Sequence, residues 1–212
     1  MDLRGHGASG RAPTYDLMSM AADVGAVLTH AGLAADSGPD QPLLVGHSLG
    51  GAVVSAFAAG GQCRGVVNVD QPLALGSFKA TLSVLEPMLR GTPDEFEGAM
   101  VAIFDQMAGP LAGEARARVE AARRPTQEVV LGVWDLVLTT PESDLDAVVD
   151  QMAAAITVPY LSLHGIDPGP DYAGWLTSRI PTATVEVWDD HGHYPHLIDS
   201  DRFVERVVSF DA

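Results

Sequence analysis

The chain has 212 residues, of which 47% are hydrophobic and 19% charged, a balance typical of one soluble globular domain with a sizeable core. Its 28 acidic and 12 basic residues give a formal net charge of −16. This charge argues against nucleic acid and anionic membranes as partners, because polyanions are bound by clustered basic side chains. No apolar run approaches the roughly 18 residues of a membrane span. Cys63 is the only cysteine, so no intrachain disulfide can form, and without a signal-peptide pattern the sequence predicts a cytoplasmic protein.

Apolar periodicity predicts helices and strands that alternate along much of the chain. The expected helices cover residues 15–31, 49–59 and 201–210. The expected strands cover residues 42–45, 66–69, 159–163 and 184–188. Such alternation is typical of an α/β fold with a mostly parallel sheet. Residues 71–157 are instead helical stretches broken by prolines, and they predict a helical cap inserted between two core segments, 1–70 and 158–212.

The segment Gly46-His47-Ser48-Leu49-Gly50 stands directly between an expected strand and an expected helix. In that context the pattern predicts a sharp turn that exposes the Ser48 hydroxyl as a nucleophile above the sheet. Glycines two positions before and after the serine fit a turn that crowds the backbone. The backbone N–H of Leu49, at the positive end of the helix, is the expected oxyanion donor. A glycine-rich turn with an incidental serine is the ordinary alternative, and the flanking elements disfavour it.

Three segments of the chain resemble motifs of the α/β-hydrolase family. They are the turn at residues 2–9, the serine turn at residues 46–51, and the Gly-His loop at residues 192–197. The order and intervals of these segments fit the family over essentially the whole chain. The resemblance implies an α/β-hydrolase fold with a helical cap, and it implies no cofactor.

A serine hydroxyl needs a neighbouring base at neutral pH, and His193, in the loop after the last expected strand, is the predicted base. His191, His196 and the pair Asp189-Asp190 lie close by in the sequence. Their spacing matches no metal-ligand signature, so we expect no metal site.

The acid that orients His193 is harder to assign from the sequence. The resemblance implies an acid between the serine and the histidine, in a loop after a late strand, and the segment 163–168 is similar to that loop. Asp167 is therefore the first choice, although the loop is one residue shorter than the usual pattern. Asp171 lies four residues further on, and Asp70 ends an earlier strand where some family members carry the acid. Both stay open as alternatives.

The family's first three strands and most of its fourth have no counterpart in this sequence. We therefore expect an N-terminally incomplete α/β-hydrolase fold that lacks the loop supplying a second oxyanion N–H. The strand at 42–45 would then be an unpaired apolar edge of the sheet, which favours association. A homodimer or a partner chain that covers this edge is the alternative explanation.

Together these residues predict a serine hydrolase that acts through an acyl-enzyme on a small ester, lactone or related carbonyl substrate. The alternative is a catalytically impaired module that keeps the fold only for binding or interaction. The larger apolar residues of the expected cap would either line the substrate pocket or form the cap's own core. They are Met88, Phe96, Met100, Phe104, Met107 and Trp134.

Overall fold

A parallel sheet lies at the centre of the structure, a computed structural model that describes residues 1–34 and 40–210. Its strands within these ranges are β1 (Leu43–His47), β2 (Gly65–Val69), β3 (Tyr160–His164) and β4 (Ala183–Val187). They lie side by side in chain order, and each pairs with the next in parallel. Each expected strand is thus confirmed to within two residues at either end.

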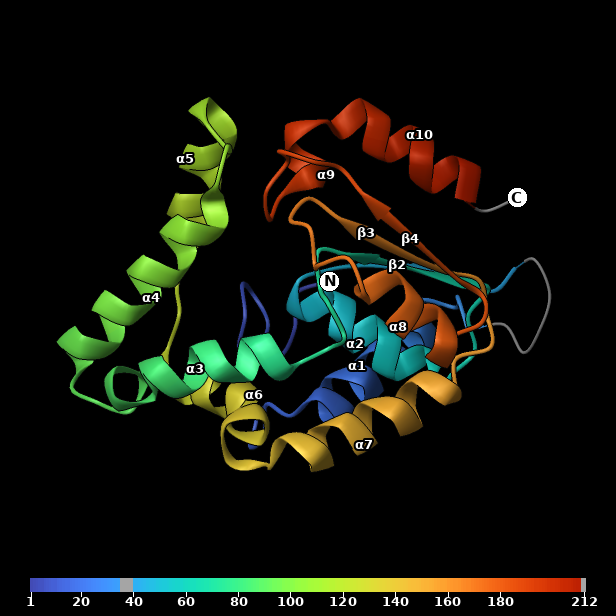
Figure 1. The fold of residues 1–212 in the computed structure, drawn as a ribbon. Coiled ribbons are helices and arrows are strands. Elements are labelled where there is room, and N and C mark those ends of the chain that lie inside the picture. Colours follow the sequence, from blue (N-terminus) through green and yellow to red (C-terminus); the bar gives the residue numbers. More distant parts are fainter. Residues whose placement is uncertain (35–39, 211–212) are drawn as a thin grey trace.

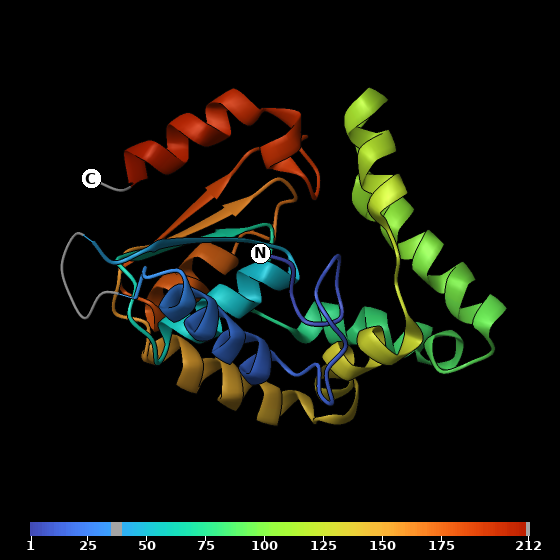
Figure 2. The same ribbon diagram turned by 180° about the vertical axis from the view of Figure 1, so that it is seen from behind.

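Helices cover both faces of the sheet. One face carries α1 (Leu17–His30), α2 (Leu49–Ala58), α7 (Glu142–Ala154) and α8 (Tyr172–Arg179), as Figures 1 and 2 show. The short α9 (Pro195–Ile198) and the closing α10 (Ser200–Phe210) lie on the other face. The described ranges contain no helix that is long and apolar enough to cross a membrane.

The two central strands explain why their sequences read as continuous apolar runs. Every residue of β2 and β3 is buried, because helices cover both of their faces. A polar network lies among them: Tyr160 Oη is 2.7 Å from Ser55 Oγ of α2 and accepts a hydrogen bond of 2.9 Å from the Asn68 side chain. This network ties α2 to β2 and β3 beneath the serine turn.

Strand β1 forms one edge of the sheet. Among the described residues its only strand partner is β2. Val45 in the middle of β1 is 46% exposed, whereas Val66 and Val67 of the neighbouring strand are fully buried. The expected apolar edge beside Ser48 is therefore confirmed.

Between β2 and β3 the chain forms the helices of the expected cap. They are α3 (Gly76–Leu89), α4 (Pro93–Ala108), α5 (Gly113–Ala122) and α6 (Gln127–Thr139), followed by α7. Figure 1 shows α4 and α5 reaching away from the sheet as an arm. A separate apolar cluster joins α3, α4 and α6 to the start of α7; its buried members are Leu82, Leu89, Phe96, Ala99, Met100, Val137, Leu138 and Leu145.

The large apolar cap residues contribute mainly to this cluster. Phe96 and Met100 are buried in it, and Phe104 and Trp134 pack against it, whereas Met88 is 39% exposed. Helix α7 differs from the other cap helices, because it contacts α2 and α8 and its Val149 belongs to the main core. The division of the chain at residue 157 stays a prediction, and the packing of α7 favours an earlier return to the core.

Candidate active site

The turn between β1 and α2 holds Ser48 in a strained backbone conformation. Its φ of 52° and ψ of −126° lie where side chains other than glycine are rarely found. Such a conformation costs on the order of 1–3 kcal/mol and persists only where the surroundings enforce it. Asp70, at the end of β2, also has a φ of 52°. Two candidate site residues, each directly after the carboxyl end of a strand, therefore have positive φ angles.

Glycines make the serine turn possible, although not at the two symmetric positions expected. A Cβ at Gly46 would lie 2.1 Å from the carbonyl oxygen of Gly50, and a Cβ at Gly51 would lie 2.2 Å from Asn68 Oδ1. A Cβ at Gly50 would meet no atom within 4 Å. The turn therefore requires glycine at 46 and 51, because there the first turn of α2 presses against β1 and β2.

Backbone hydrogen bonds set the site residues in register along the carboxyl ends of the strands. The N–H of Ser48 donates to the carbonyl of Val69 at 2.9 Å, and the N–H of Asp70 donates to the carbonyl of Leu163 at 2.7 Å. Ligands of open α/β sheets bind at this edge, beyond the carboxyl ends of the strands. The first residues after β1, β2 and β3 therefore lie next to one another at the carboxyl ends of the strands.

Asp70 is the acid that contacts His193. Its Oδ2 is 2.6 Å from His193 Nδ1, while its Oδ1 accepts hydrogen bonds from the N–H groups of Gly165 at 2.8 Å and Ile166 at 3.1 Å. Burial disfavours the charge of Asp70, but the hydrogen bond with the nearby His193 and those from the two N–H groups outweigh it and lower the pKa of Asp70. Asp70 is therefore an ionised carboxylate aimed at the ring of His193.

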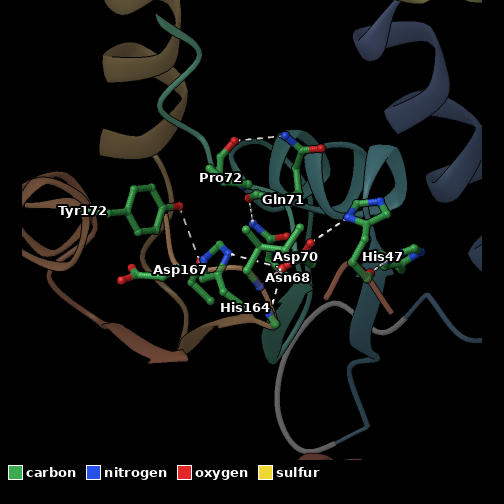
Figure 3. Close-up of polar contacts among 12 residues, drawn as sticks. His47, Asn68, Asp70, Gln71, Pro72, His164, Asp167 and Tyr172 are labelled. Carbon is green, nitrogen blue, oxygen red and sulfur yellow. Dashed lines mark hydrogen bonds and ion pairs between the residues drawn. The ribbon is translucent and has the colours of Figure 1, made fainter. Parts of the chain in front are cut away.

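The preference for Asp167 at this position is wrong. Its Oδ1 accepts a 2.8 Å hydrogen bond from the N–H of Gly169, and the side chain is exposed. Figure 3 shows the Asp167 carboxylate turned away from Asp70 and His164. The short loop after β3 is the physical reason, because it sends its N–H groups to Asp70 and its carboxylate outward. Asp171, the other alternative, is exposed at the start of α8.

His47, between Gly46 and Ser48, holds the loop of His193 against the serine turn. Its Nε2 donates a hydrogen bond of 2.7 Å to the carbonyl of His193, a contact that Figure 3 draws from the His47 ring. Burial, and after it the nearness of His193 and His196, lowers the pKa of His47 to about 3. A neutral His47 with its proton on Nε2 satisfies this bond. Sequence reasoning missed this contact, because His47 occupies a variable position of the motif.

Leu49, the expected oxyanion donor, directly follows Ser48 at the start of α2. The backbone N–H of Leu49 belongs to the first turn of α2, whose N–H groups have no partner within the helix. Within the described residues no hydrogen bond joins the Ser48 hydroxyl to His193. These residues also contain no group of three or more His, Cys, Asp or Glu side chains that could hold a metal ion.

The cap reaches the site through the turn after α4. A Cβ at Gly192, directly before His193, would lie 2.7 Å from Pro110 Cδ. Next to this contact a shallow hollow opens at the surface, and its lining includes Pro110, Asp167, Asp189 and Asp190. Pro110 of the cap and Gly192 of the histidine loop therefore both line this hollow.

Comparisons with known proteins identify the family of the chain and proteins of similar fold. A family model described as "Alpha/beta hydrolase family" matches residues 1–207. An esterase from Exiguobacterium antarcticum has a similar fold, with a TM-score of 0.73 at 19% identity over 99% of this chain and 79% of its own. MenH from S. aureus gives 0.70 at 17% identity over 99% and 81%. An enzyme that degrades N-acyl homoserine lactones, Est816, gives 0.66 at 21% identity over 99% and 80%. The comparison with curated protein sequences gives no significant match.

Proposed function

Because the chain belongs to the α/β hydrolase family, we propose that it is a serine hydrolase that forms an acyl-enzyme on Ser48. The observation that carries the proposal is the buried 2.6 Å contact between His193 Nδ1 and Asp70 Oδ2, at the sheet edge that also holds the strained Ser48. A histidine fixed in this way by a carboxylate is the arrangement that activates a serine hydroxyl.

The proposed reaction assigns one role to each group. Because Nδ1 of His193 is engaged by Asp70, its Nε2 is left to accept the proton of Ser48 as Oγ attacks the substrate carbonyl. The negative charge that develops on the carbonyl oxygen is stabilised by the N–H of Leu49. His193 then gives the proton to the leaving group. Water, deprotonated by the same histidine, hydrolyses the ester on Ser48 and regenerates the hydroxyl.

A small ester or lactone is the substrate class we propose. Two of the similar structures are described as an esterase and as an enzyme that degrades N-acyl homoserine lactones. Their low sequence identity transfers the fold alone, so the substrate class rests on the carbonyl chemistry of a serine nucleophile. The contact between Pro110 of the cap and Gly192 favours a role for the cap in shaping the acyl or alcohol pocket.

Covalent labelling tests the proposal without knowledge of the substrate. A fluorophosphonate probe should modify Ser48 in the folded protein with loss of fluoride, and peptide mass spectrometry should locate the adduct. The Ser48→Ala variant should not be labelled, whereas Ser83→Ala, which removes an exposed hydroxyl on α3, should react like the original chain.

The result also decides between the proposal and a non-catalytic module. Folded protein that leaves Ser48 unmodified, under conditions where a known serine esterase reacts fully, would refute the catalytic proposal. Labelling at Ser48 together with a burst of p-nitrophenol from a short p-nitrophenyl ester would support acylation. A burst without turnover would locate the defect in deacylation.

A further inference from the structure

His164, the last residue of β3, is a buried histidine that the proposed reaction does not use. Its side chain is completely buried, and Nδ1 has no hydrogen-bond partner within the described residues. That nitrogen lies 4.0 Å from Asp70 Oδ1, the oxygen that also accepts the N–H groups of Gly165 and Ile166. An unpartnered buried nitrogen directed at a carboxylate needs a physical explanation.

The other side of the His164 ring belongs to a chain of hydrogen bonds that begins at a backbone donor. The N–H of Leu73, which can only donate, donates to Tyr172 Oη at 3.1 Å. The Tyr172 hydroxyl proton is then free to point toward Ser162 Oγ at 3.5 Å, and Ser162 Oγ lies 2.7 Å from His164 Nε2. In Figure 3 the His164 ring lies between Tyr172 and Asp70. With every donor pointing the same way, Ser162 donates to Nε2, and the proton of a neutral His164 sits on Nδ1.

Electrostatics selects this direction over its reverse. A proton on Nδ1 presents the positive end of the N–H dipole to the Asp70 carboxylate, whereas the reverse arrangement would present a lone pair. Burial lowers the pKa of His164 to about 4 even though Asp70 and Asp167 act in the opposite sense, so the ring is neutral near neutral pH. Tyr172, which stands edge-on to the ring, is the remaining titratable group that contacts it.

We propose that His164 is a positioning residue for the Asp70–His193 pair: Ser162 and Tyr172 fix its Nδ1 proton toward Asp70 Oδ1, which leaves Oδ2 to His193. This inference rests on the proposed function of the pair. His164 would act on the pair through the charge of its N–H dipole as well as through the orientation of Asp70. The positive end of the His164 dipole offsets part of the Asp70 charge that His193 experiences.

The first test reads the proton position directly and needs no turnover. In protein labelled with ¹⁵N-histidine, long-range ¹⁵N–¹H correlation spectra at neutral pH distinguish the two neutral tautomers, and the His164→Gln variant assigns the signal. We expect His164 as the Nδ1–H tautomer. A proton on Nε2, or on both nitrogens, would overturn the inference whether or not Ser48 reacts.

The second test measures the pH dependence of fluorophosphonate acylation at Ser48. Replacing His164 by Leu removes the dipole, so the acidic limb of the acylation rate should move to higher pH by about 0.5 unit. His164→Gln, whose amide can still donate toward Asp70, should restore most of the original profile. The groups that face His193 in this experiment are Asp70, His47, His196 and Tyr194.

The direction of the shift distinguishes positioning from packing. A loss of rate with an unmoved limb, or a shift to lower pH, would contradict the proposed dipole. Absence of labelling in the original chain would refute the serine mechanism instead, while the tautomer measurement would still decide the role of His164.

Discussion

The neutral buried His164 makes the stability of the fold sensitive to acid. Burial lowers the pKa of His164 from 6.5 to about 4, so the unfolded chain takes up a proton at a higher pH than the folded protein does. The stabilisation that comes from keeping this ring neutral is therefore complete above pH 6.5 and is lost as the pH falls toward 4. At pH 5 the protonation of this one residue in the unfolded chain lowers the unfolding free energy by about 2 kcal/mol.

Other groups change the total but not the sign of this effect. Burial also lowers the pKa values of His47, to about 3, and His196, to about 4, and both add to the loss of stability in acid. Acid also relieves repulsion within a chain of net charge −16, which works in the opposite direction. The contribution of His164 is therefore best isolated by comparing variants, because the charge background is nearly the same in each.

Urea unfolding, followed by tryptophan fluorescence, measures this contribution. Between pH 7 and pH 5 the original chain should lose about 2 kcal/mol more unfolding free energy than His164→Gln, because glutamine cannot take up the proton. The matched control is His30→Gln, at the exposed end of α1, which should lose as much stability as the original chain. Equal losses in the original chain and in His164→Gln would refute a neutral, desolvated His164.

Two further predictions concern the serine turn and the sheet edge. Gly46→Ala should lower the unfolding free energy by more than about 2 kcal/mol or abolish folding, because its Cβ would meet the Gly50 carbonyl. The control Gly50→Ala places its Cβ in open space and should fold. Thermal unfolding followed by circular dichroism compares the two variants, and equal stability would contradict the close approach at Gly46. Val45→Lys places a charge on the exposed apolar edge strand β1 and should reduce any concentration-dependent association of the chain seen by analytical ultracentrifugation. Association that persists unchanged would show that the copies contact one another at another surface.

The sequence contains clear local signals for most of the fold. Each strand is a short apolar run, and the serine turn is bounded by a strand and a helix. The succession of these elements along the chain could therefore be predicted without a structure. The place of His193 at the site could be predicted because residues 192–197 resemble the Gly-His loop of the family. Helix α7 could not be assigned to the core in this way, because its amphipathic pattern does not say which apolar surface it covers.

The acid shows where a linear pattern stops being sufficient. Asp167 lies in the segment whose motif suggests an acid, but the direction of its side chain depends on the conformation of a short loop. Asp70 reaches His193 because β2 lies between β1 and β3, so that the N–H groups following β3 turn toward it. The pairing of Asp70 with His193 joins residues 123 positions apart, and the strand register that allows it is not encoded in any short motif.

The most direct test of the proposed catalytic group compares two aspartates in one assay. Asp70→Asn should reduce kcat/KM for p-nitrophenyl acetate by about 10³–10⁴-fold, because the asparagine cannot stabilise the protonated His193. Asp167→Asn, which changes an exposed carboxylate that does not contact His193, should stay within about threefold of the original rate. The opposite order of the two effects, or a folded Asp70→Asn variant with nearly full activity, would contradict the account of Ser48, His193 and Asp70 as one catalytic unit.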